Sequence, residues 1–291
     1  MGYSSWSDSA YRTVSAGRSS SSSREIFKGT RAIDPLMDPN GVKVREARDS
    51  EHHPNSVPII VAFDVTGSMG DIPTLFAQAW LGQLMKMLVE HGWVTDPQVL
   101  FAAVGDAVQD QAPLQIGQFE SGLEMDMWLT RLWLEGAGGD APESYLLPHW
   151  FAAHHTSVDA WEKRGKKGYL FTIGDARNKS LSASQVERVF GYTPDGPTDD
   201  QAVVAAAAER WELYHVLITR GRSPGKDLID HWRGLLGDRV LVLSETSAIC
   251  VLMGVVMGVK EGRIDVEAAA GALREAGMDG YGVDAVLATL G

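Results

Sequence analysis

The clearest chemical pattern in the sequence is a set of oxygen-bearing side chains that follows an apolar run. Residues 57–63 are continuously apolar and rich in β-branched side chains, and Asp64, Thr66 and Ser68 come directly after them at alternate positions. Gly67 keeps the turn between them tight. A carboxylate and two hydroxyls suit Mg²⁺, Mn²⁺ or Ca²⁺ and are poor ligands for zinc or copper. The pattern predicts a site for a hard divalent cation.

Two further carboxylates stand in comparable places along the chain. Asp140 lies in the glycine-rich turn GGDAPES, and Asp175 follows the apolar run 168–174. Taken alone, each is explained most simply as a helix cap, with Glu143 as the capping partner of Asp140. Ligands of a doubly wound sheet bind beyond the carboxyl ends of its strands, so we expect both carboxylates to lie beside the Asp64 loop.

The rest of the sequence supplies the elements that must position these residues. Strands are predicted at 57–63, 99–105, 113–119, 168–174, 212–218 and 239–243, and helices at 72–91, 122–135, 143–155, 182–189, 199–210, 226–236 and 249–259. Their alternation predicts an α/β fold, a doubly wound and mostly parallel open sheet with helices on both faces. The short run 113–119 is expected to pair with 99–105 as an antiparallel edge strand.

Composition divides the chain into three parts. Residues 1–50 are rich in Ser and Arg and lack periodic apolar patterning, so we expect a flexible N-terminal arm, of which 33–49 can lie along the domain. Residues 51–260 are expected to form the α/β domain. Residues 261–291 are expected to form a small C-terminal helical extension of two short helices.

The segment FDVTGSMG, residues 63–70, resembles the Asp-x-Ser-x-Ser signature of the metal-ion-dependent adhesion site (MIDAS) of von Willebrand factor A (vWA) domains. The order of elements from 57 to 259 is also similar to that Rossmann-like fold. The resemblance places Asp64, Thr66 and Ser68 in the first metal loop and Asp175 in the third. The second loop departs from the pattern, because it offers Asp140 where the family usually has Thr. The third reads Ile-Gly-Asp-Ala instead of Thr-Asp-Gly.

The resemblance implies binding rather than catalysis. A MIDAS holds one Mg²⁺, with Mn²⁺ or Ca²⁺ as alternatives, and a Glu or Asp side chain of a partner protein completes the coordination. Compact bacterial or phage relatives work beside AAA+ ATPases or in defence and regulatory systems, which makes a MoxR-type AAA+ ATPase a candidate partner by analogy. The added charge of Asp140 is expected to hold the cation more firmly and to polarise an incoming carboxylate less.

Two other functions stay open. Asp64 after a buried strand resembles the nucleophile of haloacid dehalogenase phosphohydrolases, but Thr66 stands where that family has a second Asp, and no Lys or His is evidently placed as general acid or base. The other is a structural subunit with a vestigial site, against which the intact set of Asp64, Thr66 and Ser68 argues.

Other titratable residues receive plainer interpretations. Asp71 is expected to cap the helix that begins at residue 72 rather than to join a second cation. Asp106 and Asp110 are expected in a solvated turn rather than at the rim of the metal. Three histidines of the helix 143–155 lack the HExxH spacing of zinc sites and are expected to be structural or exposed; they are His149, His154 and His155.

Charge and cysteine content exclude several classes of function. A net charge of −12 and a pI near 5.1 argue against a nucleic-acid-binding surface and against adhesion to an anionic membrane. Cys250 is the single cysteine, which rules out an intrachain disulfide. The N-terminus lacks the apolar region of a secretory signal, and the apolar stretch 248–259 is shorter than the roughly 20 residues of a membrane span. We therefore expect a cytoplasmic protein.

Overall fold

A six-stranded sheet runs through the centre of the protein. The structure is a computed structural model and describes residues 4–27, 32–136, 142–219 and 225–290. Within them the strand order is β4–β3–β2–β6–β7–β8, and every neighbouring pair is parallel except β3 and β4. The strands are β2 (Val57–Asp64), β3 (Pro97–Val104), β4 (Leu114–Ile116), β6 (Gly168–Gly174), β7 (Trp211–Ile218) and β8 (Val240–Leu243). The predicted fold class and its antiparallel edge strand are confirmed.

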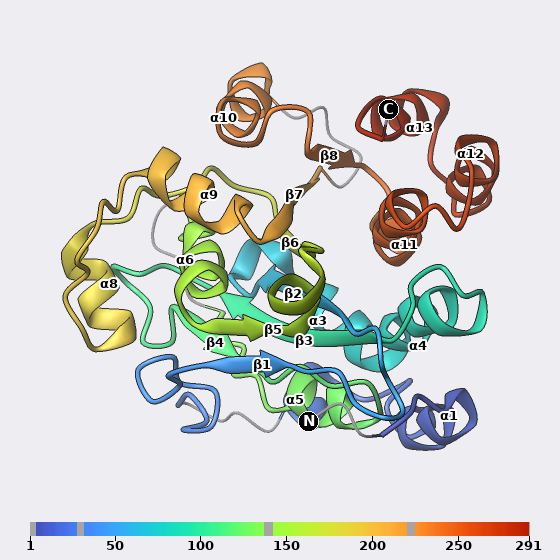
Figure 1. The fold of residues 1–291 in the computed structure, drawn as a ribbon, viewed down its shortest axis with the longest axis horizontal. Helices are drawn as coiled ribbons and strands as arrows, with labels where there is room; N and C mark the ends of the chain where they lie inside the picture. Colours follow the sequence, from blue (N-terminus) through green and yellow to red (C-terminus); the bar gives the residue numbers. More distant parts are fainter. Residues whose placement is uncertain (1–3, 28–31, 137–141, 220–224, 291) are drawn as a thin grey trace.

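Helices cover both faces of this sheet (Figure 1). On β2, Ile59, Val61 and Phe63 are buried in one core, and Ile60 and Ala62 are buried in the other. Because both faces are covered, the strand is a continuous apolar run instead of an alternating one. One face carries α6 (Leu146–His154), α8 (Ala183–Phe190), α9 (Asp200–Ala208) and α10 (Lys226–Leu236); the other carries α3 (Ile72–Leu75), α4 (Leu81–Met85), α5 (Glu124–Thr130), α11 (Ile249–Lys260), α12 (Val266–Glu275) and α13 (Gly280–Ala288).

The helix that follows β2 is continuous from Ile72 to Glu90 but not uniformly α-helical. Two π-helical stretches, Phe76–Trp80 and Lys86–Glu90, alternate with α3 and α4. Asp71 occupies the N-cap position of α3, as predicted, but its side chain makes no capping hydrogen bond. The start of this long helix therefore depends on the packing of its apolar side more than on a cap.

The described part of the N-terminal segment packs against the domain, which corrects the flexible arm expected for residues 1–50. Helix α1 (Asp8–Ala16) lies against α4, and Tyr11 on α1 is buried. Farther along, Arg18 donates two hydrogen bonds, of 2.5 and 2.7 Å, to the carboxylate of Asp126 on α5. The serine-rich composition hides these anchoring residues.

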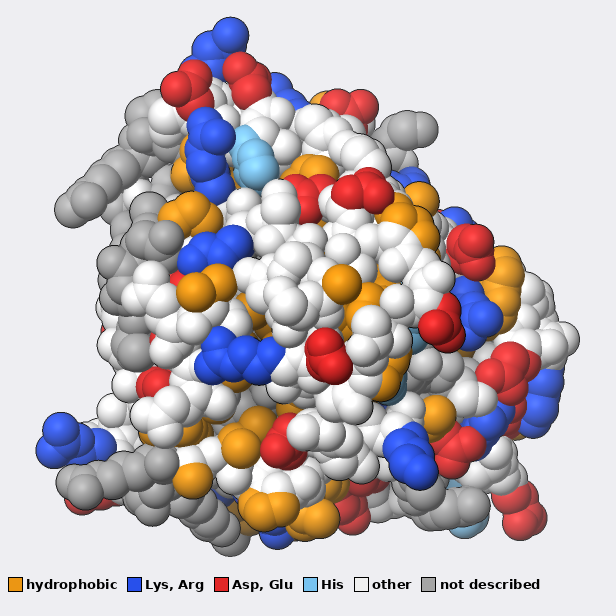
Figure 2. Space-filling view, turned by 90° about the vertical axis from the view of Figure 1, so that its left-hand side faces the viewer, with side chains coloured by type: hydrophobic (Ala, Val, Ile, Leu, Met, Phe, Trp, Pro, Cys, Tyr) orange, Lys and Arg blue, Asp and Glu red, His pale blue; other side chains and the backbone are white. Residues whose placement is uncertain are grey.

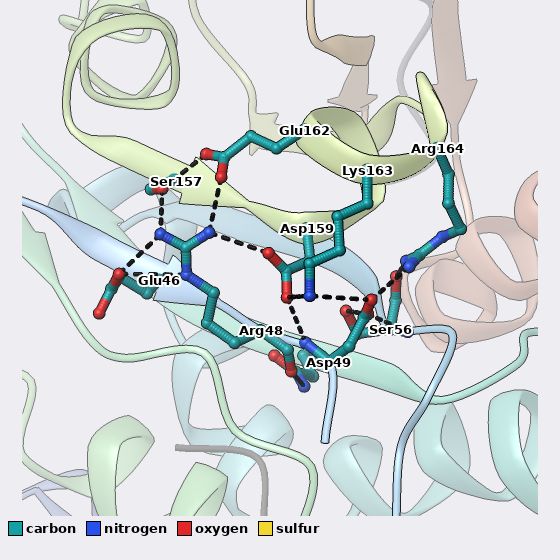
Figure 3. A network of polar contacts seen from close by, with 10 residues as sticks. Glu46, Arg48, Asp49, Ser56, Ser157, Asp159, Glu162, Lys163 and Arg164 are labelled. Atoms are coloured by element: carbon teal, nitrogen blue, oxygen red, sulfur yellow. Dashed lines mark hydrogen bonds and ion pairs between the residues drawn. The ribbon is translucent and has the colours of Figure 1, made fainter. Parts of the chain in front are cut away.

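A small second sheet also ties the N-terminal segment to the domain. Strand β1 (Arg45–Ala47) pairs in parallel with β5 (Thr156–Val158), which leads into α7 (Asp159–Arg164). None of these three short elements was predicted from the sequence. Figure 3 shows the polar network beside them, in which Arg48 binds the carboxylates of Glu46, Asp159 and Glu162, and Asp49 binds Lys163 and Arg164.

The C-terminal residues form the two short helices that were predicted. Leu273 on α12 and Val283 on α13 are fully buried in the same core as α11, so these helices complete one face of the sheet. The boundaries proposed at residues 50 and 260 stay predictions. In the described ranges, every helix is too short or too polar to cross a membrane.

Acidic and basic side chains are interspersed on the side of the molecule that carries α8. Figure 2 shows this side, where Lys and Arg side chains alternate with Asp and Glu side chains over the coloured surface. Neither sign of charge dominates the face that is drawn. The excess of negative charge is therefore not concentrated there.

Candidate metal site at the carboxyl end of the sheet

The strand order reverses between β2 and β6. From β2 the chain first adds β3 and β4 on one side and then crosses over to β6 on the other. Such a reversal of strand order is where doubly wound sheets bind their ligands. Asp64 ends β2 and Asp175 directly follows β6, so the two carboxylates flank this point.

Asp64 is fully buried and is held by three hydrogen bonds. Its Oδ1 accepts from the backbone N–H of Thr66 at 2.7 Å and from the Thr66 hydroxyl at 2.5 Å. Its Oδ2 accepts from the hydroxyl of Tyr145 at 2.6 Å. Thr66 thus folds back on Asp64 through the tight turn, and this back-bonding fixes the predicted loop.

The other predicted residues continue the same chain of contacts. Thr66 Oγ1 lies 3.3 Å from Ser68 Oγ, and the Ser68 hydroxyl donates to Asp175 Oδ1 at 2.8 Å. Thr66 is buried, whereas Ser68 is exposed to solvent. The structure therefore brings four of the five predicted site residues together, in a row that runs from the core to the surface.

The fifth predicted residue, Asp140, lies outside the described residues. The segment that leads to it starts close to the site, because a Cβ atom at Gly67 would lie 3.4 Å from the carbonyl oxygen of Gly136. The segment that follows it is bound to the third loop. Glu143 exchanges backbone hydrogen bonds with Arg177 and Lys179. The second loop is thus held near the other two at both of its described ends.

Burial and nearby negative charge both disfavour the ionised form of the Asp64 side chain. Burial raises the pKa of Asp64 to about 6, the hydrogen bonds from Thr66 and Tyr145 oppose this rise, and the charge of Asp175 adds to it. In the described part of the chain, no Lys or Arg pairs with Asp64 or Asp175. A cation beside them would supply the missing compensation.

Asp106 and Asp110 are buried, which corrects their expected position in a solvated turn. Lys179, from the loop after β6, forms an ion pair of 2.7 Å with Asp106. Asp110 accepts a hydrogen bond of 2.7 Å from the backbone N–H of Asp106. The sequence could not show this, because the lysine that neutralises the turn follows more than 70 residues later.

Glu143 is a further buried carboxylate near the site. Burial raises its pKa to about 9, and the negative charges of Asp64, Asp110 and Asp106 contribute further. Its Oε2 is buried without a hydrogen-bond partner among the described residues. Burial thus favours the neutral form of Glu143. The capping role considered for it is not seen, since α6 begins at Leu146 with Tyr145 as its N-cap.

Tyr145 is the functional residue that sequence reasoning missed. Its side chain is fully buried between the ends of β2 and β6, and a Cβ atom at Gly174 would lie 2.0 Å from its hydroxyl oxygen. In the sequence, only Gly174, directly before Asp175, indicates that another group lies close to the backbone at this point. By contrast, the histidines behave as predicted. His149 and His155 are buried and bonded to backbone carbonyls, and His154 is exposed.

The side chains present fit a hard cation and not a soft one. The oxygen donors come from two hydroxyls and two carboxylates, which is the chemistry that Mg²⁺ or Ca²⁺ requires. Across the described ranges, no three His, Cys, Asp or Glu side chains are grouped so as to hold a metal ion. A metal at this point therefore needs the hydroxyls of Thr66 and Ser68 as ligands.

Comparison with known proteins adds likenesses of fold. No family model and no curated protein matches the chain. Proximal thread matrix protein 1 from the mussel byssus is 11% identical over 69% of this chain and 47% of that one, with a TM-score of 0.45. The pilus adhesin SpaC from Lactobacillus rhamnosus GG is 10% identical over 79% and 31%, with a TM-score of 0.44. A von Willebrand factor type A structure from Catenulispora acidiphila is 14% identical over 72% and 43%, with a TM-score of 0.40.

The likeness to these three proteins concerns the fold alone. The chain spans less than half the length of each of these proteins. One structure of the mussel protein is described as having a zinc-occupied MIDAS motif, and that description belongs to that protein. The case for a metal site in this chain depends on its own residues.

Proposed function

We propose that this protein binds one divalent cation, Mg²⁺, and uses it to hold an acidic side chain of a partner protein. The proposed ligand set is Thr66, Ser68, Asp64, Asp175 and Asp140. One observation carries the proposal. The hydroxyl oxygens of Thr66 and Ser68 lie 3.3 Å apart, and each hydroxyl donates a hydrogen bond to a different carboxylate.

That arrangement has a direct chemical consequence. A hydroxyl has one proton and two lone pairs. The Thr66 hydroxyl donates a hydrogen bond to Asp64, and the Ser68 hydroxyl donates one to Asp175. Both distances are shorter than the distance between the two hydroxyl oxygens. With their protons directed at the carboxylates, both hydroxyl oxygens keep lone pairs, and they lie close enough for one cation to contact both. A cation is what such a pair of oxygens favours.

The position of the site suits capture of a carboxylate from outside. Ser68 is exposed while Asp64 is buried, so the negative charge lies beneath the surface and the hydroxyl lies at it. When bound, the cation would supply a positive charge with an open coordination position toward solvent. Asp64 and Asp175 would neutralise part of that charge from behind and keep both hydroxyls aimed.

These features support membership of the vWA family, with a MIDAS that departs from the usual pattern in its second and third loops. A MoxR-type AAA+ ATPase is the partner that the family resemblance favours. Phosphohydrolysis is less favoured, because Thr66 stands where that class of hydrolase has its second Asp.

An array of acidic peptides tests the capture of a carboxylate. Labelled protein is applied in Mg²⁺ and in chelator, with matched arrays in which each Glu or Asp is replaced by Gln or Asn. We expect Mg²⁺-dependent binding that is lost in the amide arrays and with the Ser68→Ala variant. Equal binding in Mg²⁺ and in chelator would contradict the proposal. Replacement of exposed Ser184, which lies away from the site, provides the control.

A further inference from the structure

Tyr145 occupies a position that links all three loops of the site. It stands at the N-terminus of α6, after the second loop, and its hydroxyl reaches Asp64 in the first loop at 2.6 Å. The same hydroxyl fills the space beside Gly174, directly before Asp175 in the third loop. Any residue other than glycine at position 174 would displace the tyrosine hydroxyl from Asp64.

The two oxygens of Asp64 are supported very differently. Oδ1 receives two hydrogen bonds from Thr66 within its own loop, whereas Oδ2 receives one, from Tyr145, among the described residues. Removal of the Tyr145 hydroxyl would leave Oδ2 buried and unsatisfied. A buried carboxylate oxygen without a partner favours rotation of the side chain toward another donor, and rotation would move Oδ1 away from the Thr66 hydroxyl that it accepts from.

The ring of Tyr145 is held firmly enough to impose this geometry. It meets His215 edge to face at a centroid distance of 5.2 Å and Trp232 at 5.5 Å. His215 is in turn stacked on Trp232 at 3.5 Å, and both side chains are fully buried. The hydroxyl is thus fixed by packing on β7 and α10, independently of the metal loops.

We propose that Tyr145 is a positioning residue of the cation site, and that its hydroxyl fixes the Asp64 carboxylate so that Thr66 presents its lone pair to the cation. This inference rests on the proposed function. Groups that orient the ligands of a metal typically change its affinity by about 10- to 100-fold when they are removed. Tyr145 is expected to act in this way without touching the cation.

A double-mutant cycle with Mg²⁺ titration by calorimetry tests this role. Tyr145→Phe keeps the packed ring and removes only the hydroxyl, and we expect a loss of about 10- to 100-fold in Mg²⁺ affinity. Because Asp64→Asn is expected to abolish Mg²⁺ binding, the coupling between the two residues is measured by urea unfolding in chelator, where Tyr145→Phe should have a smaller effect in the Asp64→Asn background than in the unmodified protein. Tyr214→Phe is the matched control, since Tyr214 is buried, its hydroxyl has no partner in the described chain, and it stacks on Phe171 away from the site.

The outcomes separate this inference from the proposed function. If the unmodified protein binds Mg²⁺ and Tyr145→Phe binds it equally well, the positioning role is overturned and the metal site stands. If the unmodified protein binds no Mg²⁺, both are overturned. An equal loss of affinity in Tyr214→Phe would show a general packing effect and would also overturn the role. If Tyr145→Phe does not fold, 3-fluorotyrosine at position 145 must change the affinity, whereas at position 214 it must not.

Discussion

Two groups of buried carboxylates in this protein have opposite surroundings. In the network of Figure 3, Asp159 is almost completely buried and contacts both Arg48 and Lys163. At the carboxyl end of the sheet, Asp64 is equally buried and has hydroxyls and an amide as its described partners. The first group has its counter-charges built into the chain. The second group has no counter-charge among the described residues.

The pKa values follow this difference. Burial alone would raise the pKa of Asp159, but hydrogen bonds from Lys163, the Asp49 amide and Arg48 outweigh it, and the pKa is lowered. For Asp64, burial wins and the pKa rises to about 6. Proteins tolerate a buried charge when it is paired, so an unpaired one marks a place where a ligand is expected. We call a buried carboxylate that is paired with Lys or Arg, such as Asp159, a bracing carboxylate. An unpaired one, such as Asp64, is a candidate ligand.

The largest expected effect comes from unpairing a bracing carboxylate. Arg18→Met would leave Asp126 buried without its bidentate partner, and we expect a loss of about 3 kcal/mol in the free energy of unfolding, measured with urea in chelator. Arg12→Met is the control, because Arg12 pairs with Asp8 at the surface and should change stability by less than about 1 kcal/mol. Equal effects of the two substitutions would show that the N-terminal segment is not anchored through Arg18.

A smaller effect is expected from Asp159→Asn, which removes one charge from the network. We expect a loss of about 1–2 kcal/mol in stability and no change in Mg²⁺ affinity. Asp64→Asn should show the reverse, with Mg²⁺ affinity lost and cation-free stability changed less. Urea unfolding in chelator measures the stability of both variants, and calorimetric titration measures their Mg²⁺ affinity. A large loss of stability in Asp64→Asn would mean that Asp64, too, is a bracing residue.

A third effect depends on pH. Because the folded pKa of Glu143 is about 9 against an ordinary 4.5, its contribution to stability is present below pH 4.5 and is lost as the pH rises toward 9. Glu143→Gln should therefore be more stable than the unmodified protein at pH 8.5, by at least about 1 kcal/mol. At pH 4.5 the two should be alike. Urea unfolding at both pH values, in chelator, measures this, and parallel pH profiles would contradict it.

How far the sequence could reach depends on where the relevant contacts are made. That Asp64, Thr66, Ser68 and Asp175 lie together could be predicted because they follow apolar runs, and strand ends of a parallel sheet meet at one edge. The edge strand was predictable from its spacing to β3. These features depend on local pattern and on the general topology of doubly wound sheets.

The missed features depend on contacts between distant segments. Tyr145 reaches Asp64 across 81 residues, and Arg18 reaches Asp126 across 108. In the N-terminal segment, a few buried apolar side chains, among them Tyr11, Phe27 and Met37, and ion pairs such as Arg18–Asp126 attach a stretch whose composition is typical of disorder. Short elements such as β1 and β5 have no periodic pattern long enough to be recognised.

Titration of Mg²⁺ into chelated protein, with Asp64→Asn in parallel, tests the central claim most directly. We expect one site per chain in the unmodified protein, a rise in melting temperature with Mg²⁺, and loss of both in the variant. Absence of binding to the unmodified protein, or equal binding to the variant, would contradict the claim that the unpaired carboxylates at the carboxyl end of the sheet hold a cation.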